Sequence, residues 1–173
     1  YNKKGLVFSK KYGEISMYNY FIYAEGINLL SKGYPKSAII NLEESLDKLN
    51  IPNRIIAHYY LSKAYEELGD YKMKLMHLKM LDSVQKGHSI YIIELRNGIE
   101  DLIDYYKEKG DLKKQLTYVK KLISLDSIYI NDYKSIVHTL NVKYDNKNLI
   151  NEKELLQQQL SSSVSSSRRM TYI

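Results

Sequence analysis

The chain of 173 residues has no cysteine, no tryptophan and only 2 prolines. Because cysteine is absent, the chain has no disulfide framework, no thiolate nucleophile and no cysteine-ligated zinc cluster. The same absence fits an oxidising compartment as well as the cytoplasm, so it does not locate the protein. No run reaches the roughly 18 to 20 apolar residues that a membrane-spanning helix needs.

The motifs of common catalytic and metal sites are missing as well. No H-E-x-x-H spacing, no G-x-x-x-x-G-K-[ST] loop and no G-x-G-x-x-G loop occurs. The four histidines are dispersed along the chain: His58, His77, His88 and His138. His58 falls at a packing position, so we expect it in the core. Neighbouring carboxylates such as Glu43–Glu44 lie among lysines and indicate solvated helix faces. We therefore expect no catalytic residue, no cofactor and no metal ion.

The stretch from Ile56 to Leu81 has the pattern of two helices joined by a tight turn. Leu61, Ala64 and Leu68 recur at steps of three and four, which places them on one face of an α-helix. Gly69 then supplies a corner with a positive φ, and Asp70 caps the second helix. Two helices joined this tightly lie antiparallel and leave apolar residues uncovered. We therefore expect the chain to repeat the unit and to stack the copies.

Two further copies of this unit are centred on Gly33 and Gly110. The corner glycines are 69 − 33 = 36 and 110 − 69 = 41 residues apart. Each copy has an apolar helical run, a glycine corner and a second helical run. The sequence thus predicts an all-α fold built from three helix pairs.

The three units resemble the tetratricopeptide repeat (TPR), which is about 34 residues long and has the pattern W-x2-L-G-x2-Y, then A-x3-F, then P. The W position is Ile22, His58 and Ile99 in the three units, and the L-G pair is Glu25-Gly26, Leu61-Ser62 and Leu102-Ile103. The Y position is Leu29, Tyr65 and Tyr106. The later A position is Ala38, Lys74 and Gln115, and the F position is Leu42, Leu78 and Val119. Gly26 is expected where two helices approach closely. Lys74 and Gln115 depart from the small residue that Ala38 supplies in the first unit. The resemblance implies a TPR-like right-handed superhelix of antiparallel helix pairs, with a long C-terminal helix.

This register divides the chain into three parts. Residues 1–13 are expected to be the remnant of an upstream helical unit that packs on the first helix through Leu6, Val7 and Phe8. Residues 14–143 form the TPR-like array, with units at about 19–52, 55–88 and 89–127 and a capping helix at 128–143. Ser89 is expected to cap the third unit's first helix, and Asp126-Ser127 to end its second. Residues 144–173 form a juxtamembrane-type helix and a serine-rich linker.

The resemblance places one side of each first helix on a concave groove. The candidate groove residues are aromatic toward the amino-terminal end and acidic toward the other: Tyr20, Tyr23, Ile27, Tyr59, Tyr60, Lys63, Glu67, Asn97, Glu100, Asp104 and Glu108. Tyrosines lose little conformational entropy on binding, which suits the recognition of a protein or peptide. The alternative is that residues 1–12 cover Tyr20 and Tyr23. The cationic clamp with which some TPR arrays hold chaperone tails does not match, because its positions include Tyr60 and Asp101.

The C-terminal part has a narrow apolar seam of coiled-coil type, since Leu149, Leu156, Leu160 and Val164 recur at steps of seven, four and four. The seam indicates a homodimer through residues 144–164, with a solvent-exposed helix as the alternative. The range Lys143–Leu156, together with Arg168-Arg169 and residues 170–173, resembles the sensor halves of membrane-bound regulators in Bacteroides-type bacteria. In that family periplasmic TPRs precede one transmembrane helix and a cytoplasmic kinase or helix-turn-helix module.

These resemblances imply a non-catalytic protein- or peptide-interaction module, the periplasmic signal-input domain of a membrane-bound bacterial regulator. The membrane span would lie outside these residues. A soluble cytoplasmic TPR scaffold is the alternative. A nucleic-acid-binding helical repeat is a minor alternative, carried by lysines on the second helices: Lys72, Lys74, Lys79, Lys113-Lys114 and Lys120-Lys121. It is not favoured, because these lysines and most of the tyrosines are expected on opposite sides.

Overall fold

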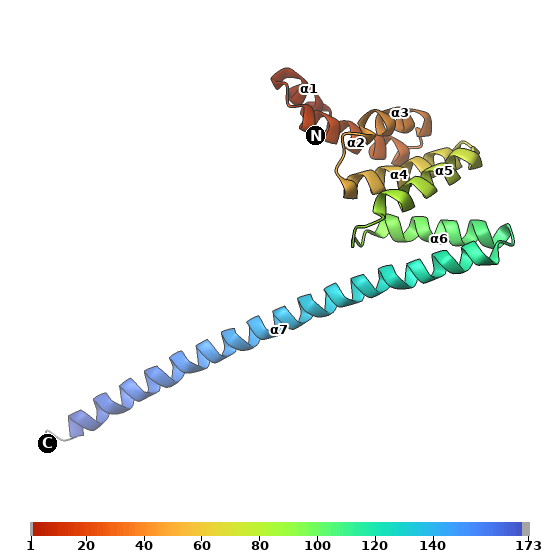
Figure 1. Ribbon diagram of the computed structural model, residues 1–173. Coiled ribbons are helices and arrows are strands. Elements are labelled where there is room, and N and C mark those ends of the chain that lie inside the picture. Colours follow the sequence, from red (N-terminus) through yellow and green to blue (C-terminus); the bar gives the residue numbers. More distant parts are fainter. Residues whose placement is uncertain (1, 171–173) are drawn as a thin grey trace. The chain divides into compact units, whose positions relative to one another are not determined.

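The computed structural model describes the backbone of residues 2–170, and it describes the side chains of 2, of 4–139 and of 147, 150, 151, 154 and 158. This part of the chain is all-α, as predicted, and contains seven helices. They are α1 (Asn2–Tyr12), α2 (Ile15–Ser31), α3 (Pro35–Leu46), α4 (Ile51–Glu67), α5 (Tyr71–Gln85), α6 (Ile93–Glu108) and α7 (Leu112–Met170). The helices pack as sequential antiparallel pairs (Figure 1). Among the described residues, none of the helices contains an apolar stretch of the length that a membrane span requires.

The corners of the three pairs lie at the predicted glycines. Gly33, Gly69 and Gly110 have φ values of +78°, +74° and +67°, a region that side chains with a Cβ rarely adopt. Beyond the second and third corners an aspartate caps the next helix. Asp70 Oδ1 accepts a hydrogen bond from the Met73 amide at 3.0 Å, and Asp111 Oδ1 accepts one from the Lys114 amide at 3.1 Å. The predicted corners are therefore confirmed.

Two buried apolar clusters hold the pairs together. The first joins α2, α3 and α4 and includes Leu30, Leu42 and Leu61, and the second joins α4, α5, α6 and the start of α7 and includes Leu78 and Leu102. Helix α4 contributes to both clusters, with Leu61 in the first and Ile55 in the second. Each pair therefore buries its apolar residues against its neighbours.

Two helical glycines allow these helices to approach closely. A Cβ added to Gly26 of α2 would lie 2.8 Å from Leu42 Cγ and 3.3 Å from the Ala38 carbonyl oxygen of α3. This confirms the close approach expected at Gly26. A Cβ on Gly98 of α6 would lie 2.9 Å from Leu81 Cδ1 of α5, a second close approach that the repeat pattern did not predict.

Two expected helix boundaries are wrong. Helix α6 begins at Ile93 with Ile92 as its N-terminal flanking residue, so Ser89 does not cap it. The longer period comes from α5, which has 15 residues where α3 has 12, and from a longer loop after α5. Helix α7 does not end at Asp126-Ser127. The Ser127 hydroxyl donates to the Ile123 carbonyl at 2.9 Å inside the continuing helix. A separate capping helix at 128–143 is therefore not present.

The chain divides into two compact units, residues Tyr1–Ile128 and Tyr129–Ile173. This division falls close to the predicted end of the third repeat unit. The seam residues Leu149, Leu156, Leu160 and Val164, like Arg168-Arg169, lie outside the described side chains. The homodimer through residues 144–164 therefore stays a prediction.

At the other end, α1 packs on α2 in a different way from the one expected. Gly5 faces the ring of Phe21, which leaves no space for a Cβ at this position. The hydroxyl of the buried Ser9 donates to the Gly5 carbonyl at 2.8 Å. Val7 and Phe8 are 69% and 56% exposed, so these two side chains do not form the contact.

The close approach at Gly26 generates a stability prediction. We expect Gly26→Leu to lower the free energy of unfolding by about 1 to 3 kcal/mol, because the added side chain has no space beside Leu42 and the Ala38 carbonyl. Denaturation followed by circular dichroism measures the change. Asn28→Leu, on the exposed side of the same helix, is the control and should shift stability by less than about 0.5 kcal/mol. An unchanged stability of Gly26→Leu would contradict this packing.

Candidate functional site

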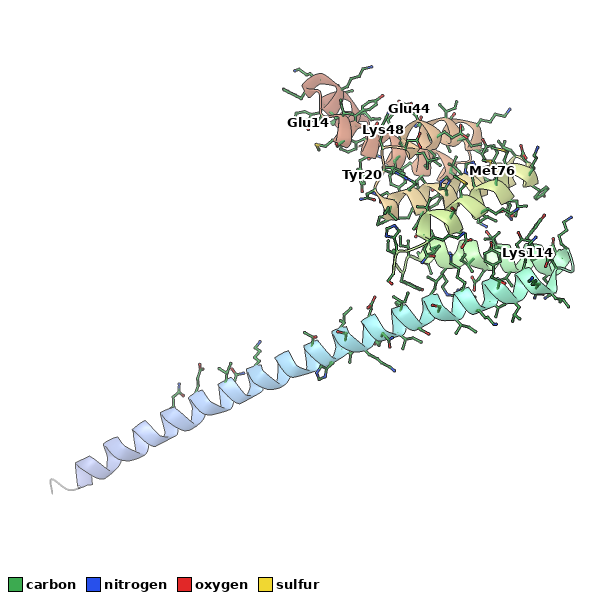
Figure 2. All side chains as sticks on the ribbon, viewed as in Figure 1. Glu14, Tyr20, Glu44, Lys48, Met76 and Lys114 are labelled. Atoms are coloured by element: carbon green, nitrogen blue, oxygen red, sulfur yellow. The ribbon has the colours of Figure 1, made fainter. Side chains whose placement is uncertain are left out.

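The candidate groove residues lie on α2, α4 and α6, and these first helices of the pairs contact one another in sequence, α2 with α4 and α4 with α6. Tyr20 lies on α2 (Figure 2). Its side chain is 53% exposed. Glu67, Asp104 and Glu108 are exposed as well, whereas Ile27, Tyr59, Tyr60, Lys63, Asn97 and Glu100 are half-buried. Tyr23 is 5% exposed and belongs to the first core, so it does not line an open surface.

Three accessible tyrosines of α2 and α4 are here called the tyrosine surface: Tyr20, Tyr59 and Tyr60. The rings of Tyr59 and Tyr60 meet edge to face with their centroids 5.5 Å apart, and Tyr20 lies 6.0 Å from the buried Tyr23. Burial, and after it the charge of Glu94, raises the pKa of both Tyr23 and Tyr60. The field of Glu94, in the first turn of α6, thus reaches tyrosines of α2 and α4. Glu94 was not among the residues predicted to line the groove.

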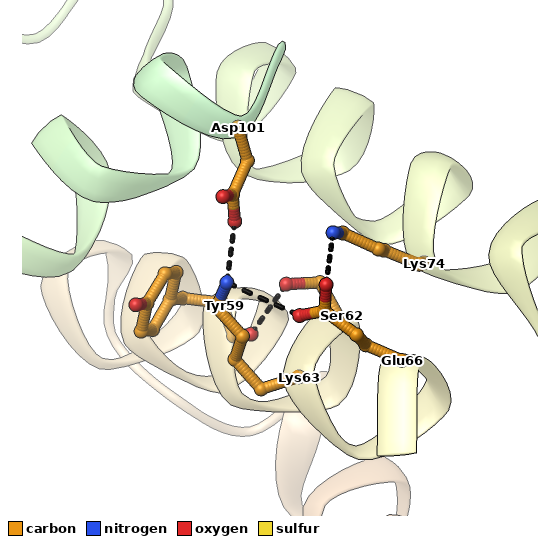
Figure 3. Close-up of polar contacts among 6 residues, drawn as sticks. All are labelled: Tyr59, Ser62, Lys63, Glu66, Lys74 and Asp101. Atoms are coloured by element: carbon orange, nitrogen blue, oxygen red, sulfur yellow. Dashed lines mark hydrogen bonds and ion pairs between the residues drawn. The ribbon is translucent and has the colours of Figure 1, made fainter. Parts of the chain in front are cut away.

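Beside the tyrosine surface, a chain of ion pairs joins α4, α5 and α6 (Figure 3). Lys63 Nζ lies 2.7 Å from Asp101 Oδ2 of α6 and 3.2 Å from Glu66 Oε2 of its own helix. Lys74 Nζ of α5 lies 2.5 Å from Glu66 Oε1. Lys63 also lies 5.5 Å from the centroid of the Tyr59 ring, in the range of a cation–π contact.

These contacts pair the ammonium group of Lys63 with carboxylates of the same chain. Burial alone would lower the pKa of Lys63, but the hydrogen bond to Asp101 and the charges of Asp101 and Glu66 raise it above its ordinary value. Burial alone would likewise raise the pKa of Glu66, and the hydrogen bond from Lys74 with the charge of Lys63 lowers it instead. Lys63 therefore links α4 to α6 through an ion pair and is not a free cation of a groove.

An acidic cavity of about 360 Å³ opens between the ends of α4, α5 and α6. Asp104 and Glu108 line it together with Glu66, Asp101, Tyr71, Lys74, Leu75, Leu78 and Tyr105. Three of the eleven candidate groove residues, Asn97, Glu100 and Asp104, line a second cavity between α6 and α7. The structure thus brings the acidic candidates of α6 to two cavities, and Asp104 lines both of them.

Several of the charged candidates already have partners within the chain. Arg96 forms ion pairs with Glu100 and with Asp126 of α7. Its Nη1 lies 2.6 Å from Glu100 Oε1, and its Nε lies 2.9 Å from Asp126 Oδ1. The hydrogen bonds to Asp126 and then to Glu100 raise the pKa of Arg96. Among the lysines expected to form a basic patch, Lys121 pairs with Asp82 and Lys114 lies 3.2 Å from Asp111. These contacts reduce the charge that is free to bind a ligand.

Two histidines that are far apart in the sequence form a buried pair. His58 of α4 and His77 of α5 are 2% and 4% exposed, and their Nδ1 atoms lie 3.1 Å apart. One ring donates and the other accepts, so at least one of them is neutral. The ring of Tyr65 stacks on the ring of His77 with their centroids 5.4 Å apart. The Tyr65 hydroxyl donates a hydrogen bond of 2.9 Å to Glu43 Oε1. The core position expected for His58 is confirmed, but its pairing with His77 was not predicted.

The surroundings of the pair favour the neutral rings. Burial, followed by the charges of His77 and Arg54, lowers the pKa of His58 to about 4, and the charge of Asp47 opposes this only partly. Burial also lowers the pKa of His77, against the opposite effect of Glu43. His77 Nε2 is buried without a hydrogen-bond partner, which leaves no acceptor for a second proton. The pair is therefore a neutral part of the core at pH 7.

In the part of the chain that the structure describes, no group of three or more histidine, cysteine, aspartate or glutamate side chains could hold a metal ion. Comparison of the chain with models of known families, with curated proteins and with solved structures finds no match.

The histidine pair generates a pH prediction. Because the folded-state pKa of His58, about 4, lies below its ordinary value of 6.5, the unfolded chain binds the proton more readily. The stabilisation is complete above about pH 6.5 and is lost as the pH falls toward 4. It amounts to roughly 3 kcal/mol over that range. Urea denaturation at a series of pH values should show this loss.

The variant His58→Gln removes the group that takes up the proton, so its free energy of unfolding should depend less on pH between 6.5 and 4 than that of the unmodified chain. His88→Gln is the matched control, because His88 is exposed. The same pH dependence in His58→Gln and in the unmodified chain would show that His58 is not neutral because of its burial.

Proposed function

We propose that the chain is a non-catalytic TPR-like module that binds a peptide or an extended protein segment along α2, α4 and α6. The observation that carries this proposal is the tyrosine surface, where Tyr20, Tyr59 and Tyr60 come from two helices and keep part of their rings accessible. Such side chains offer a large apolar area and a hydroxyl group at little cost in conformational entropy. The corner glycines and the close approach at Gly26 support the TPR-like arrangement.

The chemistry of the surface indicates what kind of segment it binds. The tyrosines offer apolar rings and hydroxyl groups to a peptide backbone, and Asp104 and Glu108 are exposed on α6. Lys63 and Lys74 are both engaged with carboxylates and so do not balance these two charges. A segment with apolar residues followed by a lysine or arginine matches this order of side chains.

A selection from a random peptide library against the full chain tests this proposal. We expect selected peptides to bind less tightly, by roughly tenfold, to Tyr20→Ala and to Tyr60→Ala, because truncating an aromatic contact residue costs about 1 to 2 kcal/mol. Tyr133→Ala is the control, since Tyr133 is 59% exposed on the other compact unit. Peptides that bind all four proteins equally would contradict a role for the tyrosine surface.

We further propose that this module is the periplasmic signal-input domain of a membrane-bound bacterial regulator. The support is the resemblance of the range Lys143–Leu156, with Arg168-Arg169, to the segment that precedes the membrane span in such regulators. In this proposal a bound segment changes the curvature of the helix pairs or the pairing of the helix at residues 144–164. The signal then reaches an output module across the membrane.

The gene sequence that follows residue 173 separates the regulator from a cytoplasmic TPR scaffold. We expect an apolar run of about 20 residues directly after Ile173, because a single helix of that length crosses a bilayer. A stop codon, or a continuation into further repeats, would contradict the regulator and support the scaffold. This result does not bear on the tyrosine surface, which both proteins would use.

A further inference from the structure

The outward face of the first part of α7 carries apolar side chains that no described residue of the first compact unit covers. Leu112 is 75% exposed, Leu116 54% and Ile123 62%. They recur at steps of four and seven along the helix, so they share one side of it. The opposite side of α7 packs in the second core through Tyr118, Leu122 and Leu125. In this part of α7, apolar residues thus occupy two faces, and only one of these faces packs in the core.

The repeat explains which kind of element belongs on the free face. Six residues after each corner glycine stand Ile39, Leu75 and Leu116, and nine residues after it stand Leu42, Leu78 and Val119. In the first two pairs the residues nine positions after the corner are fully buried, Leu42 also against Gly26 of its own pair, and Leu75 is half-buried. Leu42 is 0% exposed in a cluster with Leu61 of α4, and Leu78 is 1% exposed, 3.6 Å from the Cβ position of Gly98 in α6. In the third pair Val119 is only half-buried and Leu116 is open.

A cavity marks the place that a further helix would fill. It has a volume of about 490 Å³ and lies between α6 and α7. Val119 and Leu122 of α7 form its apolar wall, and Ile103, Asn97, Asp101 and Asp104 of α6 are among its other lining residues. We call this cavity, together with Leu116 and Ile123, the end slot.

The ion pair between α4 and α6 indicates the charge of the missing helix. Lys63 stands six residues before Gly69 and reaches Asp101 of the next first helix at 2.7 Å. Six residues before Gly110 stands Asp104, which therefore has the place of Lys63 with the opposite charge. Asp104 is exposed, and among the described residues it forms no ion pair. A helix in the end slot needs a cation where α6 has Asp101.

We propose that the end slot binds an amphipathic helix of a partner protein, with its apolar side on Leu116, Val119 and Ile123 and a lysine or arginine against Asp104. The partner helix continues the stack as α6 continues α4 and α5. This inference does not rest on the tyrosine surface. It concerns α7 and a helical ligand rather than an extended one, although both proposals use Asp104 of α6.

Peptides with the sequence of α6 itself provide a matched pair of probes. The first is the unmodified segment Ile93–Glu108, which would place Asp101 against Asp104. The second is the same segment with Asp101→Lys. Fluorescence anisotropy of labelled peptides, titrated with the full chain, measures both affinities. We expect saturable binding of the Asp101→Lys peptide, at least fivefold tighter than that of the unmodified peptide, because one ion pair replaces one repulsion.

Substitutions in the full chain locate the binding site. Asp104→Lys should reverse the preference between the two peptides. Leu116→Asp should weaken binding of the Asp101→Lys peptide by at least tenfold, because a charge would enter the apolar contact. Ile40→Asp, at a position that is 65% exposed on α3, is the control and should leave binding unchanged. Both substituted apolar residues are open to solvent, so the variants keep their fold, which circular dichroism verifies.

No saturable binding of either peptide at millimolar protein, equal affinities for the two peptides, or equal binding to Leu116→Asp and the unmodified chain would each overturn the proposal. Tyr20→Ala separates this inference from the proposed function. We expect it to leave peptide binding at the end slot unchanged, and a loss of binding in this variant would place the peptide on the tyrosine surface instead, which also overturns the proposal.

Discussion

A pair of short antiparallel helices cannot bury its apolar side chains between its own two members, and this constraint governs the whole stack. Helix α4 shows how the chain meets it, since its residues enter the first core on one side and the second core on the other. Gly26 and Gly98 let neighbouring helices come close enough for Leu42, Leu78 and Leu81 to lose contact with water. Burial in one pair therefore depends on the presence of the next.

The polar groups between the helices make the junctions different from one another. Six residues before Gly33 stands Ile27, and nine residues before Gly69 stands Tyr60; both pack against the first core. The corresponding positions at the next junction are Lys63 and Asp101, which form an ion pair. An apolar contact in one junction and a charged contact in the next favour one order of the pairs, because exchanging them would bury an unpaired charge.

The features that could be predicted from the sequence are those that local chemistry determines. A corner with positive φ requires glycine, and Asp70 caps the helix that follows its corner, so the helix pairs were recognisable. The ends of helices were less predictable. Ser127 satisfies its hydroxyl within α7 and Asp126 pairs with Arg96, so neither residue ends that helix. The burial of Tyr23 could likewise not be predicted from the periodicity, because a tyrosine at that step fits a core as well as a surface.

The candidate site was predictable only in its residue types. Its helices were recognised, but the partners of its charges come from other helices: Asp101 and Glu66 for Lys63, and Arg96 for Glu100. The pairing of His58 with His77 could not be found for the same reason, since the two lie 19 positions apart on different helices and match no motif. Such contacts depend on the rotation of one helix against its neighbour, which periodicity fixes only for the apolar side.

The charges of the first helices follow from where each helix stands in the stack. Lys63 lies in the middle of the array and finds its counter-charge on α6, which lowers the energetic cost of its partial burial. Asp104 has the same place in the next unit, where the described chain supplies no further first helix, and it is exposed. An aspartate at this position stays hydrated while the junction is empty, and it becomes favourable to bury only when a cation arrives with the covering helix. The pairing of charges between first helices, as at Lys63 and Asp101, therefore makes the last pair selective for a helix that carries a cation.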